Sequence, residues 1–201
     1  VMVNEFSASA SEIFAAAIQD YGRGVVVGSN TFGKGTVQRF FPLADAANQL
    51  RIKTENEDLG ALKQTVAKFF RINGGATQLR GVAPDVKLPG IYEFIDVGEK
   101  EYDHALPWTS IKPAYYTKYS ADFDLENLSK QTKNRVDTSE YFKSVLENAM
   151  LIKESKDITK LPLGLDAFRS YKAKRKEISD AAKIKEIAID DVSYELNKID
   201  L

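Results

Sequence analysis

The chain has 201 residues, of which 43% are hydrophobic and 28% are charged. This length and composition are typical of a globular protein with a substantial core, and they exclude a wholly disordered chain. Lys and Arg total 28 against 29 Asp and Glu, so the net charge of -1 gives no basic field that would attract nucleic acid. The sequence has no cysteine and one histidine, which excludes disulfides, thiol nucleophiles and metal sites built from several histidines.

The beginning of the chain alternates between short apolar runs, a helical segment and a glycine-containing loop. β-Branched residues in the apolar runs predict strands, and apolar residues spaced three and four apart predict a helix that ends at Gly22. The predicted order is a strand at 1–3, a helix at 13–21, a strand at 25–27, a loop at 28–33 and a strand at 36–41. This order is typical of an α/β fold.

The following segment is predicted to be extended, with turns. Residues 44–62 are polar and irregular, which predicts a loop. A strand is predicted over 64–72, and its partner is expected to follow residues 73–75 (Asn-Gly-Gly), a hairpin-type turn. A further extended segment is predicted at 81–86.

The composition changes at about residue 99, beyond which strand patterns almost disappear. Helical periodicity and many charges predict helices over 122–133, 138–153 and 165–199. We therefore expect two domains, residues 1–98 and residues 99–201. Trp108 is expected to anchor the helical region on the first domain, and the Lys- and Glu-rich run 172–185 is expected to be a solvated helix face.

The loop over residues 28–35 nearly matches the phosphate-binding motif G-x-x-x-x-G-K-[ST]. Position 35 is glycine where the motif needs a hydroxyl for magnesium, and a strand is predicted to follow where a phosphate loop must open a helix. Nucleotide binding is therefore not expected.

Ser9 allows two interpretations. Ser9 and Glu12 fit the capping box [ST]-x-x-[DE], in which the serine only begins a helix. A serine in a tight strand-to-helix turn between Ala8 and Ala10 could also be a nucleophile, because helix amides can stabilise an oxyanion there. This motif alone favours the cap and leaves the nucleophile open.

Lys34 also has two interpretations, a solvated loop lysine and a general base. Lysine can accept a proton when burial disfavours its charged form, and a base other than histidine would suit a chain with one histidine. If the strand starts at Gly33, alternation places Lys34, Thr36 and Gln38 on one face, and Gln38 could then hold the amine in position. Without further information the solvated lysine is favoured.

Five segments together resemble the tail-specific proteases, also called carboxyl-terminal processing peptidases. They are Phe6–Ile13, Thr31–Gln38, Arg71–Gln78, Gly81–Asp85 and Ala105–Trp108. The last segment resembles the long periplasmic branch of the family, which has an extra C-terminal domain. The motifs cover the first hundred-odd residues. The remainder resembles the family only in its generally helical character.

The resemblance implies part of a crotonase-like serine protease core followed by a mainly helical C-terminal domain. It also implies a Ser-Lys dyad, with Ser9 as nucleophile, Lys34 as general base and Gln38 as the residue that orients the lysine. The Ala10 amide would be one oxyanion donor. Asp20 matches an acidic residue that has been implicated in the family.

The resemblance further implies a serine endopeptidase that needs no metal or cofactor and cleaves envelope proteins with apolar C-terminal tails in the periplasm. The chain begins within a predicted strand, so we expect a C-terminal fragment of a longer protein that has a PDZ-containing part upstream. We expect this fragment to be inactive alone, with an exposed edge at 1–3 that a second copy could cover. The alternative is a non-catalytic module that binds a partner through its helices, with Ser9 serving as a cap.

Overall fold

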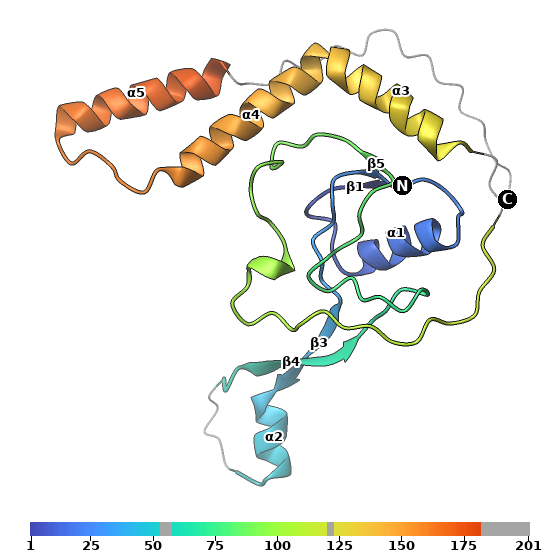
Figure 1. The fold of residues 1–201 in the computed structure, drawn as a ribbon. Helices are drawn as coiled ribbons and strands as arrows, with labels where there is room; N and C mark the ends of the chain where they lie inside the picture. The colour runs from blue at the N-terminus through green and yellow to red at the C-terminus, as the bar shows by residue number, and fades with distance from the viewer. Residues whose placement is uncertain (53–57, 120–122, 182–201) are drawn as a thin grey trace, which may run out of the picture.

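A parallel sheet with the strand order β1-β2-β5 lies at the centre of the first part of the chain. The computed structural model describes residues 1–52, 58–119 and 123–181 (Figure 1). The three strands are β1 (Met2–Val3), β2 (Val27–Gly28) and β5 (Val86–Lys87). Val27 pairs with Met2 on one side and with Val86 on the other.

Helix α1 (Ala10–Asp20) connects β1 to β2 and packs against the sheet through its smallest side chains. Alanine favours the helical backbone and lets the helix approach the strands closely. The core cluster consists of Val3, Ala15, Ala16, Val26 and Val82. The predicted strand–helix–strand order of this region is confirmed, although β2 begins only at Val27.

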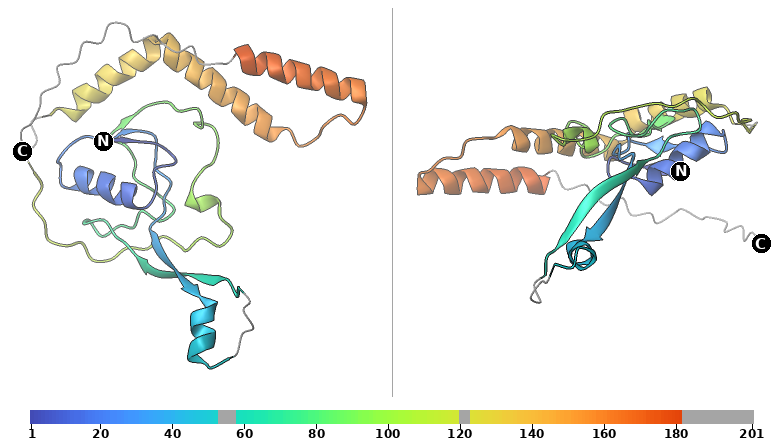
Figure 2. Two further views of the ribbon diagram at one scale, coloured as in Figure 1. Left: turned by 180° about the vertical axis from the view of Figure 1, so that it is seen from behind. Right: turned by 90° about the horizontal axis from the view of Figure 1, so that it is seen from below.

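A two-stranded antiparallel arm, β3 (Thr36–Pro42) with β4 (Ala61–Lys68), projects from this core and has helix α2 (Leu43–Gln49) at its far end (Figures 1 and 2). The loop predicted for residues 44–62 is wrong over α2. Three alanines and a leucine in seven residues favour a helix once Pro42 has ended the strand.

The hairpin partner predicted for the segment 64–72 is also wrong. The true partner of β4 is β3, which precedes it in the chain. Across the turn at 73–75 only one bridge forms, between Phe70 and Ala76. A local turn pattern favours the nearer partner, but β3 offers a longer run of backbone groups for pairing.

The segment between the sheet and the helices, residues 99–119, runs across the first part of the chain. It begins with a short 3₁₀ helix, η1 (Glu99–Glu101). The Trp108 indole Nε1 donates to the Ala76 carbonyl oxygen at 2.8 Å, and the Arg80 guanidinium lies 3.8 Å from the centre of the indole ring. Trp108 therefore anchors this segment on the first part of the chain, in agreement with the role expected for it.

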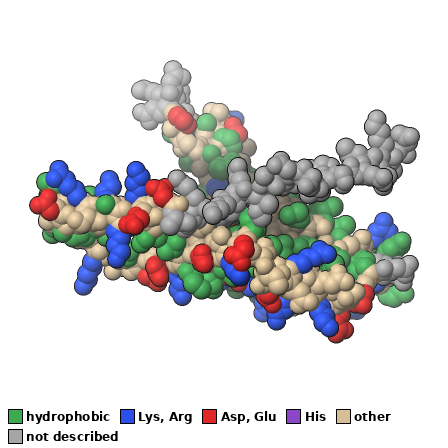
Figure 3. Space-filling model, turned by 90° about the horizontal axis from the view of Figure 1, so that it is seen from above, with side chains coloured by type: hydrophobic (Ala, Val, Ile, Leu, Met, Phe, Trp, Pro, Cys, Tyr) green, Lys and Arg blue, Asp and Glu red, His purple; other side chains and the backbone are tan. Residues whose placement is uncertain are grey.

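Three helices follow, α3 (Leu125–Thr138), α4 (Glu140–Asp157) and α5 (Leu165–Ala181). They lie on the side of the sheet opposite the arm (Figure 1), and α3 contacts β5. Basic and acidic side chains are interspersed along them (Figure 3). The three predicted helices are confirmed where the structure describes them; residues 122 and 182–199 of those predictions lie outside the described part.

The fold is thus a mixed α/β unit followed by a mainly helical region, as predicted. No helix in the described part of the chain is both long and apolar enough to cross a bilayer.

Candidate active site

Ser9 lies at the N-terminus of α1 with a backbone conformation that an ordinary helix cap does not need. Its φ is 57° and its ψ is -114°, whereas cap residues adopt extended backbone with negative φ. A positive φ in a non-glycine residue costs about 1–3 kcal/mol and is concentrated at functional sites. The half-buried Ser9 thus has the strained strand-to-helix geometry of a nucleophile elbow, in addition to its position as a cap.

The carboxylate of Glu12, one turn into α1, joins the Ser9 turn to the Lys34 loop. Its Oε2 accepts the backbone N–H of Ser9 at 2.9 Å and that of Lys34 at 2.8 Å. Its Oε1 accepts the Gly33 N–H at 2.7 Å and the Thr31 hydroxyl at 2.5 Å. The Glu12 side chain is 0% exposed, so these four donors replace its hydration.

Lys34 is half-buried, and within the described residues its Nζ forms no hydrogen bond or ion pair. The loop around it is held by backbone contacts. The Gly35 N–H donates to Gln78 Oε1 at 2.8 Å, and a Cβ at position 35 would lie 2.6 Å from the Gln78 backbone nitrogen. Glycine at position 35 therefore serves this close approach, which explains why the phosphate-binding motif fails there.

The alternation predicted to place Lys34, Thr36 and Gln38 on one strand face is wrong, because β3 begins only at Thr36 and its register shifts between Val37 and Gln38. No contact in the described part of the chain tests the roles predicted for Gln38 and Ala10. The Gln38 amide donates to the Thr36 hydroxyl at 3.4 Å, and a β-bulge separates Gln38 from Val37. Within the described residues Gln38 has no hydrogen bond to Lys34. The Ala10 amide is the first in α1 and has no hydrogen-bond partner in the described part of the chain.

Asp20 lies at the other end of α1, about 15 Å along the helix axis from Ala10 at the ~1.5 Å rise per residue. Its carboxylate binds the Arg71 guanidinium through two bonds of 2.6 and 2.9 Å and accepts the Asn73 amide at 3.2 Å. The structure therefore places Asp20 in a nearly buried ion pair, apart from the other predicted site residues.

Three buried polar residues of this site, Glu12, Thr31 and Gln78, are not predicted as site residues by the sequence. The sequence pattern predicts Glu12 only as the partner in a capping box. Gln78 joins the Gly35 amide to the Leu106 carbonyl oxygen of the connecting segment. The spacing of Ser9 and Glu12 is one signal, and Thr31 and Gln78 each stand in a segment that resembles the family. Only the fold shows that these residues bond to one another's loops at the site.

Comparison with known protein families shows which family the chain belongs to. Residues 1–88 match "Peptidase family S41", and residues 92–198 match "C-terminal domain of tail specific protease". The second match covers more than half of the chain. The chain belongs to the tail-specific protease family. The resemblance in the sequence motifs is thereby confirmed.

Curated relatives of this tail-specific protease chain carry the same kind of name. The chain is 50% identical over 116 residues to "Tail-specific protease" of Haemophilus influenzae, covering 58% of the chain and 16% of that protein. It is 57% identical over 89 residues to "Carboxyl-terminal-processing protease" of Picosynechococcus, covering 44% and 18%. A solved structure titled "Photosystem II D1 C-terminal processing protease" aligns at a TM-score of 0.35 with 36% identity over 44% of this chain and 19% of its own. The chain thus spans less than a quarter of the length of these proteins.

We predict that Glu12→Gln lowers the free energy of unfolding by about 2–4 kcal/mol, because an amide oxygen cannot replace a carboxylate that accepts four bonds, each worth ~1.5–3 kcal/mol. Urea unfolding of the purified protein measures this. Glu5→Gln is the matched control, since the half-buried Glu5 accepts a single hydroxyl, that of Ser29. Equal losses of unfolding free energy for the two substitutions would contradict the prediction that the four bonds to Glu12 stabilise the protein more than the one bond to Glu5.

We predict that the contribution of Asp20 to stability and activity depends on its ion pair with Arg71. Removing one partner of a buried ion pair costs about 3–5 kcal/mol, so Asp20→Asn and Arg71→Gln should each destabilise the protein strongly. The double variant should lose much less than the sum of the two, and both single variants should lower kcat/KM to a similar extent. A protein with Arg71→Gln that keeps full activity while Asp20→Asn is inactive would instead give Asp20 a direct catalytic role.

Proposed function

We propose that this chain carries the catalytic Ser-Lys dyad of a serine endopeptidase, with Ser9 as nucleophile and Lys34 as general base. The strongest support is the Glu12 carboxylate, whose Oε2 accepts the amides of both residues and so couples their positions. The strained backbone of Ser9 is a second support, because a cap alone would not require it.

In the proposed reaction the Ser9 hydroxyl oxygen attacks the carbonyl carbon of the scissile peptide bond, and the neutral amine of Lys34 accepts its proton. The Ala10 amide donates to the oxyanion of the tetrahedral intermediate. Lys34 then returns the proton to the leaving amine, and an acyl-enzyme remains on Ser9. Water, activated by Lys34, hydrolyses this ester. Gln38 orients the lysine side chain.

We infer that the substrates are envelope proteins with apolar C-terminal tails and that the enzyme works in the periplasm. The names of the relatives, tail-specific and carboxyl-terminal-processing proteases, support a substrate recognised at its C-terminus. The proposal includes an upstream PDZ-containing part of the same protein that engages the tail, residues 1–98 and 99–201 as separate domains, no cofactor and no nucleic-acid partner.

The proposal is tested on the full-length protein with a serine-reactive fluorophosphonate. We expect labelling that Ser9→Ala abolishes and that Ser11→Ala, a change of the exposed serine two residues away, leaves intact. Lys34→Arg should be inactive because a guanidinium stays protonated and cannot act as a base. Gln38→Ala should be milder, because orientation is lost while the base remains.

Labelling that survives Ser9→Ala would contradict the enzyme and favour the non-catalytic partner-binding module. Substantial peptidase activity of Lys34→Arg would remove Lys34 from the mechanism.

We also predict that residues 1–201 alone do not cleave peptides, although they contain both members of the dyad. Loss of one oxyanion donor can cost ~10²–10³ in rate, and Ala10 supplies only one of the donors that acyl transfer needs. β1 is an edge strand within the described sheet, which leaves a second copy of the chain free to pair with it. The test incubates the purified chain with an unfolded substrate that has an apolar C-terminus; cleavage that Ser9→Ala abolishes would refute the prediction.

A further inference from the structure

The connection between α4 and α5 exposes a group of leucines that none of the roles described above uses. Leu163 is 100% exposed, and Leu161 and Leu165 are 55% and 63% exposed. We call residues 161–165 the leucine tip. Apolar side chains gain free energy when they leave water, so three exposed leucines within five residues indicate a surface that contacts something apolar.

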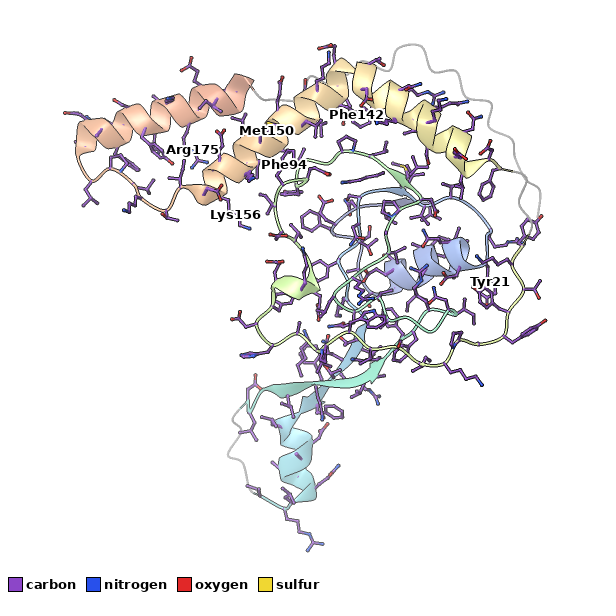
Figure 4. The ribbon with its side chains drawn as sticks, viewed as in Figure 1. Tyr21, Phe94, Phe142, Met150, Lys156 and Arg175 are labelled. Carbon is purple, nitrogen blue, oxygen red and sulfur yellow. The ribbon has the colours of Figure 1, made fainter. Side chains whose placement is uncertain are left out.

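The leucine tip lies at one end of the molecule, away from the sheet (Figures 1 and 2). It joins two helices that contact each other, because the Arg175 guanidinium of α5 lies between the helices and donates to the Ser155 hydroxyl of α4 (Figure 4). The hollow of about 230 Å³ between α4 and α5 is lined by residues other than the three leucines. The leucines therefore protrude from the end of this helix pair.

Basic side chains follow the leucine tip along α5. Residues 158–176 contain six Lys or Arg and one Asp, although the whole chain has a net charge of -1. The one acid, Asp166, lies 3.7 Å from Arg169, and the next acids are Glu177 and Asp180 at the far end of α5. The basic residues of α5 are all exposed: Arg169, Lys172, Lys174, Arg175 and Lys176.

Three of these basic residues continue directly from the leucine tip. Leu165, Arg169, Lys172 and Lys176 are spaced four, three and four residues apart, so they share one stripe of α5. We call Arg169, Lys172 and Lys176 the basic stripe. Within the described residues neither Lys172 nor Lys176 forms an ion pair. The stripe is thus apolar at the tip and positively charged behind it.

We propose that the leucine tip and the basic stripe bind the surface of an anionic lipid bilayer. The leucines enter the boundary between the headgroups and the acyl chains, and the basic stripe contacts the lipid phosphates. Interfacial helices combine apolar burial with attraction to anionic lipids in this way. A bilayer suits this surface better than a protein partner does, because it accepts a protruding apolar tip without a complementary pocket.

The test measures co-sedimentation of the full-length protein with vesicles made of equal parts of phosphatidylcholine and phosphatidylglycerol. We expect binding that weakens as salt is raised. Binding to pure phosphatidylcholine vesicles should be about 100-fold weaker, because each of the three basic residues contributes about 5-fold in affinity at an anionic surface. Inorganic phosphate should release no more protein than chloride of equal ionic strength; specific release by phosphate would assign a free-anion site instead.

The apolar part is tested by Leu161→Ser combined with Leu163→Ser. Affinity for the anionic vesicles should fall about 10-fold or more, because the apolar contact with the bilayer is lost. Leu50→Ser combined with Ile52→Ser is the matched control, since these side chains at the end of the arm are 72% and 55% exposed. The control should bind as the unchanged protein does.

The charged part is tested by Lys172→Ala combined with Lys176→Ala, which should lower affinity for the anionic vesicles about 25-fold and leave binding to neutral vesicles unchanged. Lys130→Ala combined with Lys133→Ala, two exposed lysines of α3, is the matched control. All substituted side chains are exposed, so urea unfolding should show the same stability for every variant.

The proposal is overturned if the full-length protein does not bind the anionic vesicles, or if the control pairs lower binding as much as the test pairs do. It is independent of the proposed function, because the tip and the stripe contain no residue of the dyad. Labelling of Ser9 in solution should therefore be equal in all variants. If Ser9 is not labelled while vesicle binding follows the expected pattern, the proposed function fails and the membrane surface stands.

Discussion

The buried Glu12 carboxylate is the interaction on which the rest of the site depends. Ser9 adopts a backbone conformation that is unfavourable for serine, and the carboxylate compensates by accepting its N–H. The same carboxylate accepts two amides and a hydroxyl from the loop of residues 31–34. A fully buried charge is tolerated only with such complete hydrogen bonding, so the helix and the loop are held in one relative position. This position brings the backbones of Ser9 and Lys34 together.

A second buried polar side chain, Gln78, extends this arrangement to the rest of the chain. Its amide oxygen accepts the Gly35 N–H, and its amide nitrogen donates to Glu99 and to the carbonyl oxygen of Leu106. The segment that leads to the helices is thereby linked to the loop that carries Lys34. Trp108 strengthens the link through Ala76 and Arg80. The connecting segment therefore helps to hold the loop that carries Lys34, in addition to leading to α3.

The fold was predictable where the signals were local. Periodicity located α1, β3 and the three C-terminal helices because helix and strand periods appear directly in the order of apolar residues. The pairing of β4 was not predictable in this way. The Asn-Gly-Gly turn favoured the nearer partner, whereas β4 pairs with β3 along its whole length, across the α2 excursion. Strand pairing depends on contacts distant in sequence, which no local pattern records.

The sequence by itself determined the family, the Ser9 and Lys34 motifs and the helical character of the second half, because these depend on residue types at fixed short spacings. Only the tertiary structure showed that Glu12 joins the two motifs and that Asp20 is paired with Arg71. The loop partners of Glu12 lie 19 to 22 residues away in the chain, and the partners of Asp20 lie 51 to 53 residues away. Burial and hydrogen-bond geometry arise from folding, so they could not be read from the order of residues.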